Sequence, residues 1–364
     1  MKKFLSLVIA LLLTLTSCGS KSNNNEILVG VPEPLTGEYA QYGNSIKEGI
    51  ELKIAEINEK GGINGKKVKA IYQDTKGDVQ EVVNIFKQMA NQKVDVVIGE
   101  AISANSSALA ELAQKAKIPM ITPAGTAMDI TKDRDYVFRT TFTDPYQGEV
   151  LAKYLKKEGA TNVALLTNNG SDYSVGVANS FKATASKEGV SVTEECYTNS
   201  DKDFKSVLTK LKNMGVKTIV IPDYYNTIGL ILSQAKEVGL EAQYYGADGW
   251  DGIQDSFAKL AEGAVFSSQF TSDDTSPAVQ EFIKNYKKKF NKEPLIFAAL
   301  GYDAMTTIEN AIKQGGNLKD ALAKTDLELL TGHIKYDENR NPKKKVSFVQ
   351  IKDGKQVLKE KFGD

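Results

Sequence analysis

The chain has little histidine, cysteine or tryptophan. Among its 364 residues, His333 is the only histidine and Trp250 the only tryptophan. A two-histidine zinc site is therefore excluded, and a Ser-His-Asp triad or a histidine proton shuttle would have to use His333. The motifs G-x-S-x-G and H-E-x-x-H are absent, and the two S-x-x-K matches lack the partner motifs that give them meaning. We expect no enzyme activity, no metal and no cofactor.

The chain also lacks an excess of charge and a pair of spare cysteines. Acidic and basic residues balance at 46 each, so nothing indicates a nucleic-acid surface. The two cysteines are Cys18 and Cys196. If Cys18 is modified at a processed N-terminus, no intrachain disulfide is possible, and packing alone must hold the fold together.

No apolar run is long enough to cross a bilayer. The longest, residues 4–15, spans about a dozen residues against the roughly twenty required, and it follows two lysines. We interpret residues 1–17 as a secretory signal peptide. Its Leu-Thr-Ser-Cys ending resembles the bacterial lipobox, which implies a lipid on Cys18 that anchors the protein to a membrane outside the cytoplasm. An ordinary signal with a cysteine there by chance is the alternative. Polar residues 18–25 are expected to form a flexible tether.

From residue 26 onward, short β-rich runs alternate with amphipathic helical patterns. Strands are predicted near residues 27–31, 68–72, 94–98 and 119–122, with helices at 45–60, 79–91 and 106–117 between and after them. The alternation then restarts, with strands near residues 162–167, 190–192, 218–221 and 244–246 and helices at 146–158, 175–187, 204–212 and 228–237. Two long helices at residues 278–290 and 295–314 follow, and then a hairpin with strands near 332–336 and 345–352. The pattern predicts two α/β lobes with doubly wound parallel sheets and a cleft between them.

Several short segments follow one another in a characteristic order along the chain. They are Pro34-Leu35-Thr36-Gly37, Ala40-x-Tyr42-Gly43, Gly61-Gly62-Ile63-x-Gly65, Val97-Ile98-Gly99, Ile121-Thr122-Pro123-Ala124-Gly125-Thr126, Asp203-Phe204, Gly239-Leu240 and Gly301-Tyr302-Asp303-Ala304. Their joint order and spacing resemble the branched-chain amino-acid binding proteins, the Leu/Ile/Val-type substrate-binding components of ABC importers. The resemblance covers nearly the whole mature chain.

The resemblance implies a type 1 periplasmic-binding-protein fold, whose two lobes are joined by a three-crossing hinge and close on a ligand. It implies one lobe of residues 26–143 plus 274–344 and a second of residues 144–273 plus 345–364. It also implies a monomer that works with membrane permease subunits and cytoplasmic ATPases. A lipid on Cys18 would keep the protein near that permease.

A binding site for the ligand carboxylate is expected in the first lobe. Ser103 follows a predicted strand and precedes a helix expected to begin near Asn105 or Ser106, where N–H groups and a hydroxyl can bind a carboxylate. Gly125 and Thr126 resemble the family's second ligand contact. The alternatives are a serine N-cap and an ordinary strand-to-helix loop.

An ammonium contact is expected from Asp248, which follows a predicted strand at the crevice edge of the second sheet. The resembling family position holds an acidic residue, often Glu, so the shorter Asp would place the ligand deeper. The alternative is a surface-loop aspartate.

Aromatic walls are expected from both lobes. Tyr42, Tyr173 and Tyr224 align with wall positions of the family, and Phe270 is a further, weaker choice. Tyr225 replaces Tyr224 if the register is off by one residue. Trp250 fits either the core or the rim of the pocket.

These features predict a solute-binding protein of an ABC importer that captures a branched-chain or other aliphatic amino acid between its lobes. A ligand sensor of the same fold that docks on a membrane receptor, or a binder of amides, urea or aromatic acids, stays open as an alternative. An extracellular enzyme is the least favoured interpretation.

Overall fold

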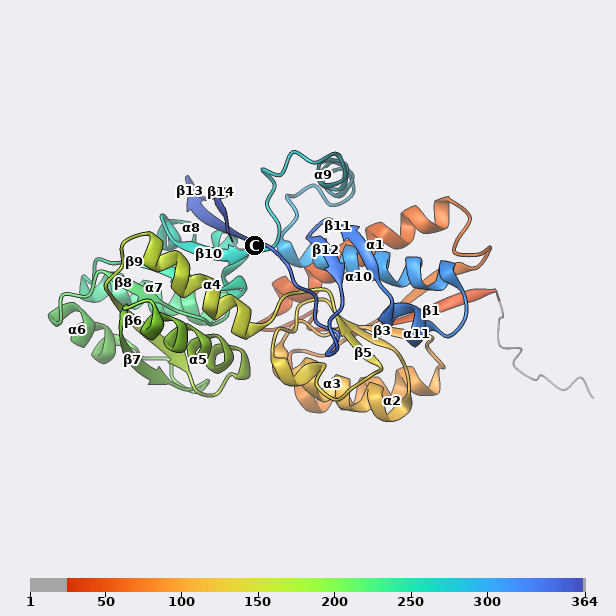
Figure 1. The fold of residues 1–364 in the computed structure, drawn as a ribbon, viewed down its shortest axis with the longest axis horizontal. Coiled ribbons are helices and arrows are strands. Elements are labelled where there is room, and N and C mark those ends of the chain that lie inside the picture. Colours follow the sequence, from red (N-terminus) through yellow and green to blue (C-terminus); the bar gives the residue numbers. More distant parts are fainter. Residues whose placement is uncertain (1–24, 363–364) are drawn as a thin grey trace, which may run out of the picture.

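Two β-sheets organise the protein, one in each of two lobes that lie side by side (Figure 1). The structure is a computed structural model and describes residues 25–362. The first sheet is entirely parallel, with the strand order β2-β1-β3-β4-β5. Its strands are β1 (Glu26–Glu33), β2 (Lys67–Asp74), β3 (Val96–Ile98), β4 (Met120–Thr122) and β5 (Val137–Arg139).

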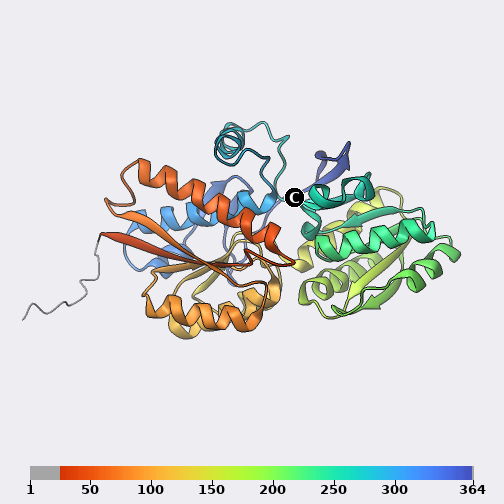
Figure 2. The same ribbon diagram turned by 180° about the vertical axis from the view of Figure 1, so that it is seen from behind.

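Helices cover both faces of this first sheet (Figure 2). One face carries α1 (Ala40–Glu59) and α10 (Ile296–Gln314), and the other carries α2 (Val79–Asn91) and α3 (Ser103–Ala116). The smaller elements of this part of the chain are the 3₁₀ turn η1 (Met128–Ile130), α9 (Pro277–Phe290), α11 (Leu318–Ala323), β11 (Asp326–Leu329) and β12 (Gly332–Lys335).

The second sheet has seven strands in the order β14-β13-β10-β9-β8-β6-β7. They are β6 (Asn162–Asn168), β7 (Ser191–Tyr197), β8 (Thr218–Val220), β9 (Gln243–Gly246), β10 (Val265–Ser268), β13 (Val346–Lys352) and β14 (Lys355–Phe362). Its helices are α4 (Asp144–Lys157), α5 (Asp172–Lys187), α6 (Lys205–Asn213), α7 (Tyr225–Val238) and α8 (Ile253–Ala261), with the 3₁₀ turn η2 (Asp248–Trp250). Alternate residues of β6 enter opposite cores, so that Leu165 packs with α4 and α5 and Leu166 packs with α6 and α7.

The sequence-based prediction that strands near residues 332–336 and 345–352 form a hairpin is wrong. β12 pairs with β11, whereas β13 joins the second sheet and pairs antiparallel with β10 and β14. Val346, Phe348, Val349 and Ile351 of β13 are buried in the second lobe, so hydrophobic burial draws that strand away from β12. The second sheet is consequently mixed rather than wholly parallel.

The chain passes between the lobes three times, after β5, after β10 and after β12. Hydrogen bonds hold these passages in place. Gln269 Nε2 of the second donates to Thr141 Oγ1 of the first at 2.7 Å, and Asn341 Oδ1 of the third accepts from Thr131 Oγ1 of the first lobe at 2.9 Å. The first two crossings are therefore bonded to each other, and the third is bonded to the first lobe.

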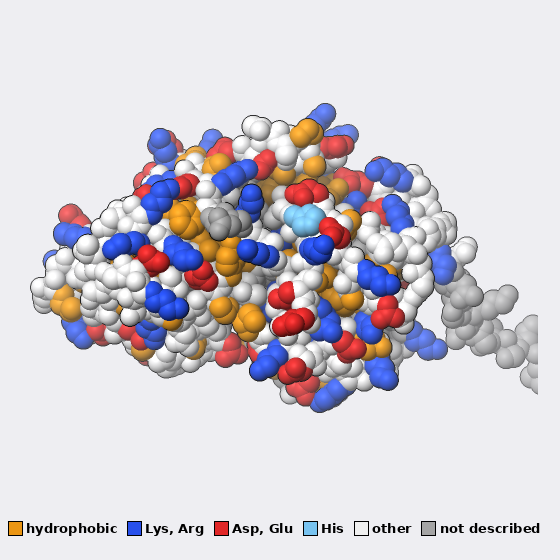
Figure 3. Space-filling model, in the orientation of Figure 1, with side chains coloured by type: hydrophobic (Ala, Val, Ile, Leu, Met, Phe, Trp, Pro, Cys, Tyr) orange, Lys and Arg blue, Asp and Glu red, His pale blue; other side chains and the backbone are white. Residues whose placement is uncertain are grey.

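The surface mixes charges of both signs, and basic and acidic side chains are interspersed over the face seen in Figure 3. This agrees with the balanced composition. None of the helices within residues 25–362 is both long and apolar enough to span a bilayer.

Helices α1 and α10 touch through two glycines. A Cβ atom built on Gly49 would lie 1.9 Å from the Ala298 carbonyl oxygen, and one on Gly301 would lie 2.4 Å from that of Ile46. The close approach brings the ring of Tyr42 on α1 to 4.3 Å from that of Phe297 on α10, measured between centroids. Both rings face the space between the lobes.

We predict that Gly49→Ala lowers the free energy of unfolding by about 3 kcal/mol, because the added methyl group overlaps a backbone oxygen that cannot move alone. In an exposed helix, alanine stabilises by about 1 kcal/mol over glycine. A loss of stability in Gly49→Ala therefore indicates a steric overlap rather than a helix-propensity effect. Urea denaturation measures it, with Glu59→Ala at the exposed end of α1 as the control. A Gly49→Ala protein as stable as the unsubstituted protein would contradict the close packing.

Candidate functional site

A narrow cavity lined by residues of both lobes lies where the two lobes meet. The first lobe contributes Tyr42, Ala101, Ser103, Ala124, Thr126 and Phe297, and the second contributes Tyr173, Tyr224, Asp248 and Gly249. Six of the eight residues predicted from the sequence therefore line one cavity.

The topology explains why these residues meet. Ser103 follows β3 and Thr126 follows β4, while Tyr173, Tyr224 and Asp248 follow β6, β8 and β9. In parallel sheets flanked by helices, the loops at the carboxyl ends of the strands form one edge of each lobe. The two edges face each other across the hinge.

Ser103 begins α3, rather than preceding it as predicted. The N-cap is Ile102, which offers no side-chain hydrogen bond. The Ser103 hydroxyl instead accepts from the Thr126 N–H at 3.3 Å and the Ala127 N–H at 3.4 Å, and it lies 3.5 Å from Thr126 Oγ1. Two hydroxyls and a helix N-terminus are thus grouped on one wall of the cavity, an arrangement that favours an anion.

Gly125 lies behind this wall and does not line the cavity. Its N–H donates to Thr122 Oγ1 at 2.8 Å and its carbonyl accepts from Arg139 Nη1 at 3.0 Å. A Cβ atom on Gly125 would approach Ser106 Oγ to 2.6 Å. The glycine therefore lets the loop that carries Thr126 pack against α3.

Asp248 forms the opposite, acidic wall. Its side chain is 4% exposed, its Oδ1 accepts from Gln147 Nε2 at 3.0 Å, and its N–H donates to Gln147 Oε1 at 3.0 Å. Burial raises the pKa of Asp248 to about 6, against which the hydrogen bonds from Gln147 and Tyr173 favour the charged form. Its hydrogen-bond partners are neutral groups, and among residues 25–362 no cation pairs with its charge.

Three tyrosines connect the walls. Tyr42 Oη donates to the Gly249 carbonyl at 2.6 Å and accepts from the Tyr225 N–H at 3.0 Å, so one first-lobe hydroxyl bonds two segments of the second lobe. Tyr173 accepts from the Gly249 N–H at 3.0 Å and stacks on Tyr224 with ring centroids 5.1 Å apart. The aromatic side chains therefore close the cavity as well as line it.

The other aromatic predictions fall outside the cavity. Phe270 packs edge-on against Phe282 at 5.9 Å, in the second passage between the lobes. The Tyr225 hydroxyl donates to the Glu38 carbonyl at 3.0 Å, which leaves Tyr224 as the wall residue. Trp250 is fully buried and its Nε1 donates to the Ile221 carbonyl at 2.7 Å, so it is a core residue.

Phe297 lines the cavity but was missed from the sequence. It is the second residue of a long apolar helix, where an aromatic residue carries no chemical signal of its own. The close packing of α1 on α10 brings it against Tyr42.

Contacts outside the cavity also join the lobes. Gln41 Nε2 donates to the Gly252 carbonyl and to Asp255 Oδ2, each at 2.9 Å. Asn226 Nδ2 donates to the Glu38 carbonyl, beside the bond from Tyr225. The structure is therefore the closed arrangement of the two lobes.

A family model described as "Periplasmic binding protein" matches residues 26–356. The chain belongs to this family. Membership implies an extracytoplasmic location and confirms the prediction of a binding protein rather than an enzyme.

Individual relatives resemble the chain over most of its length. The leucine-, isoleucine-, valine-, threonine- and alanine-binding protein of Pseudomonas aeruginosa is 29% identical over 322 residues, 86% of either chain. The crystal structure of the leucine binding protein LivK from Thermotoga maritima MSB8 matches with a TM-score of 0.87 and 30% identity, covering 93% of this chain and 99% of that one. LivJ from Streptococcus pneumoniae in complex with isoleucine also matches with a TM-score of 0.87, at 34% identity and 92% and 98% coverage. These matches confirm the predicted fold class.

We predict that Asp248→Asn stabilises the ligand-free protein at pH 8. The pKa of Asp248 is raised to about 6 in the folded protein. Its contribution to stability is therefore fully present at pH values below its pKa in the unfolded chain, and it is lost as the pH rises through 6. Asparagine has no charge to desolvate, so the gain at pH 8 reaches up to about 3 kcal/mol and disappears near pH 3.5. Urea denaturation across this range measures the difference.

The control is Asp172→Asn, an exposed residue beside Tyr173 on α5. Parallel stability curves for Asp248→Asn and the unsubstituted protein would show that Asp248 is not held in a destabilising environment.

Proposed function

We propose that this protein captures an aliphatic amino acid, in particular a branched-chain one, in the cavity between its lobes and delivers it to the permease of an ABC importer. The observation that carries the proposal is the buried, uncompensated carboxylate of Asp248 facing the hydroxyl wall of Ser103 and Thr126 across an aromatic cavity. A free amino acid is a small molecule with one group for each wall.

The two ends of the ligand need opposite partners. A carboxylate would accept from the Ser103 and Thr126 hydroxyls at the N-terminus of α3, where the helix dipole favours an anion. An ammonium would pair with Asp248. Burying either charge without its partner costs several kcal/mol, so both contacts are required together.

The side chain of the ligand would lie among apolar and aromatic groups. Ala101, Ala124, Tyr42, Tyr224 and Phe297 supply this part of the lining. They form no charged contact for a ligand side chain, which supports an aliphatic ligand over a basic or acidic one. The names of the P. aeruginosa and T. maritima relatives, and the isoleucine held by the S. pneumoniae protein, support the same ligand class.

The proposed lipid anchor would attach through the N-terminal tether, away from the cavity. Cys18 and tether residues 19–24 lie outside the described residues. β1 begins at Glu26 at the far end of the first lobe (Figure 1). A tether of residues 18–25 spans at most about 28 Å when extended, so a lipid on Cys18 would hold a monomer close to the membrane with its cavity free.

We predict that L-leucine, L-isoleucine and L-valine each raise the melting temperature of the protein, since a ligand at about a hundred times its Kd adds roughly 2.7 kcal/mol of stability. Asp248→Asn should weaken leucine binding by more than about a hundredfold, because the ammonium would be buried opposite a neutral amide. Thermal shift and isothermal titration calorimetry measure the two effects.

Asp172→Asn serves as the matched control and should bind as the unsubstituted protein does. Urea, short amides and aromatic acids belong in the same screen. A response to these compounds alone, or an Asp248→Asn protein with full affinity for leucine, would overturn the proposal.

A further inference from the structure

Two buried glutamates follow neighbouring strands behind the hydroxyl wall. Glu33 ends β1, and Glu100 comes just after β3, which pairs with β1. Both side chains are fully buried. The N–H of Ala101, a residue that lines the cavity, faces both carboxyl groups.

The surroundings of the two glutamates differ. Glu100 Oε1 accepts from Thr75 Oγ1 at 2.7 Å and from Asn105 Nδ2 at 2.9 Å, while Oε2 accepts from the Ile102 N–H at 2.7 Å. Within residues 25–362, neither carboxyl oxygen of Glu33 has a hydrogen bond of ordinary geometry. Donors favour a charged carboxylate, and their lack favours a protonated one.

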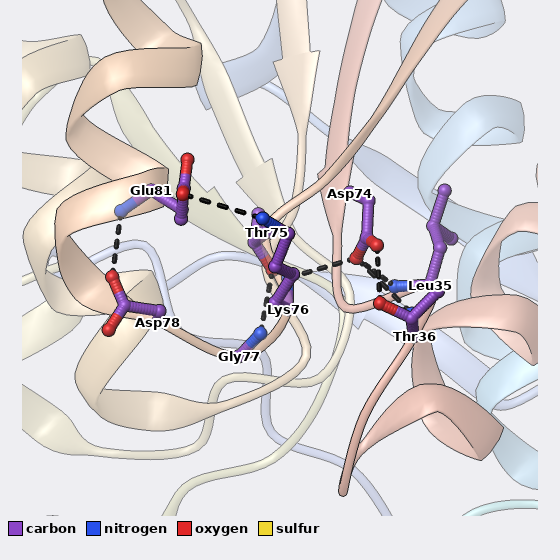
Figure 4. A network of polar contacts seen from close by, with 8 residues as sticks. All are labelled: Leu35, Thr36, Asp74, Thr75, Lys76, Gly77, Asp78 and Glu81. Carbon is purple, nitrogen blue, oxygen red and sulfur yellow. Dashed lines mark hydrogen bonds and ion pairs between the residues drawn. The ribbon is translucent and has the colours of Figure 1, made fainter.

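No cation contributes to the contacts of the pair within the described part of the chain. The titratable neighbour is Tyr39, in the loop before α1, and the polar neighbours are Thr75 after β2 and Asn105 on α3. The nearby Asp74 carboxylate is occupied elsewhere, because it accepts from Leu35 N at 2.9 Å, Thr36 Oγ1 at 2.5 Å and Lys76 N at 2.9 Å (Figure 4). The charge on the two glutamates is therefore not balanced by a cation among the contacts described.

Charging both carboxyl groups is disfavoured, because both are buried and the charge of Glu100 acts on Glu33. Burial and the neighbouring Glu100 raise the pKa of Glu33 well above its ordinary value. Burial also raises the pKa of Glu100, and the hydrogen bonds to its charged form limit this rise to about 7. These directions agree with the asymmetry of the hydrogen bonds.

Glu100 also shapes the turn that enters α3. Its side chain binds the Ile102 N–H and Asn105, and its carbonyl accepts from Ser106 Oγ at 2.6 Å. Ala101 and Ser103 lie on the same turn and line the cavity. Any change in the charge of Glu100 therefore acts directly beside the hydroxyl wall.

We propose that Glu33 keeps its proton at neutral pH, that Glu100 carries the charge of the pair and positions the turn bearing Ala101 and Ser103, and that ligand capture makes Glu100 take up a proton. The last step rests on the proposed function, because it requires a ligand carboxylate at Ser103. An anion there repels the Glu100 carboxylate, so the bound state favours protonated Glu100.

The first experiment tests the pair without any ligand. Urea denaturation of the unsubstituted protein and of Glu33→Gln is compared between pH 5 and pH 7. If Glu33 is protonated in the folded protein, the unsubstituted protein loses stability relative to Glu33→Gln as the pH rises. The folding equilibrium constant then falls by close to tenfold per pH unit. Parallel curves would overturn the assignment of the proton to Glu33, whether or not leucine binds.

The second experiment tests the coupling to binding. Leucine binding is followed by calorimetry at pH 7.0 and 8.5, in buffers of different ionisation enthalpy. A rise of one unit in the pKa of Glu100 on binding weakens leucine binding about fourfold at the higher pH and gives measurable proton uptake. Glu33→Gln should retain this dependence and Glu100→Gln should lose it.

The direction in which leucine affinity changes with pH separates Glu100 from Asp248. Ionisation of Asp248 strengthens binding as the pH rises through about 6, whereas loss of the proton from Glu100 weakens it. Affinity that is flat or rises between pH 7.0 and 8.5, or a Glu100→Gln protein that keeps the dependence, would overturn the coupling. If Glu100→Gln does not fold, proton uptake by the unsubstituted protein still decides the question. A protein that binds no leucine would contradict the proposed function, while the ligand-free experiment would still test the pair.

Discussion

The burial of charge between the lobes is the constraint on which the rest of this structure depends. Asp248 is almost completely buried and its partners are neutral, so the closed protein holds a carboxylate whose natural complement is a cation. The opposite wall offers hydroxyls and a helix N-terminus. Neither wall is satisfied by the other, because the cavity separates them, and the proposed zwitterionic ligand would satisfy both.

Closure is the means by which this constraint acts. The acidic wall belongs to one lobe and the hydroxyl wall to the other, so the site exists only when the lobes meet. Tyr42 ties the closing motion to the site, since its hydroxyl bonds both Gly249 and Tyr225 while its ring lines the cavity. The glycine contacts of α1 and α10 fix that tyrosine at the lobe edge.

Much of the fold and of the candidate site could be predicted from the sequence. Strand–helix alternation places the loops after parallel strands at one edge, which is why Ser103, Thr126 and Asp248, predicted from this pattern and from the family resemblance, line one cavity. Phe297 and the partners of β13 depend on long-range packing, which leaves no local pattern. Gly125 lies in the predicted loop, but it packs behind the hydroxyl wall and does not line the cavity. Glu33 was not recognised, because a single acidic residue ending an apolar strand gives no sign of its burial.

The central claim is that both charged ends of one small molecule are bound at once. Calorimetry at pH 7.5 with L-leucine, L-leucinamide and 4-methylpentanoate tests it most directly, because the analogues lack the carboxylate and the ammonium respectively. The account predicts that leucine binds and that each analogue binds at least about a hundredfold more weakly. Equal affinity for leucine and 4-methylpentanoate would contradict it, since Asp248 would then have no ammonium to bind.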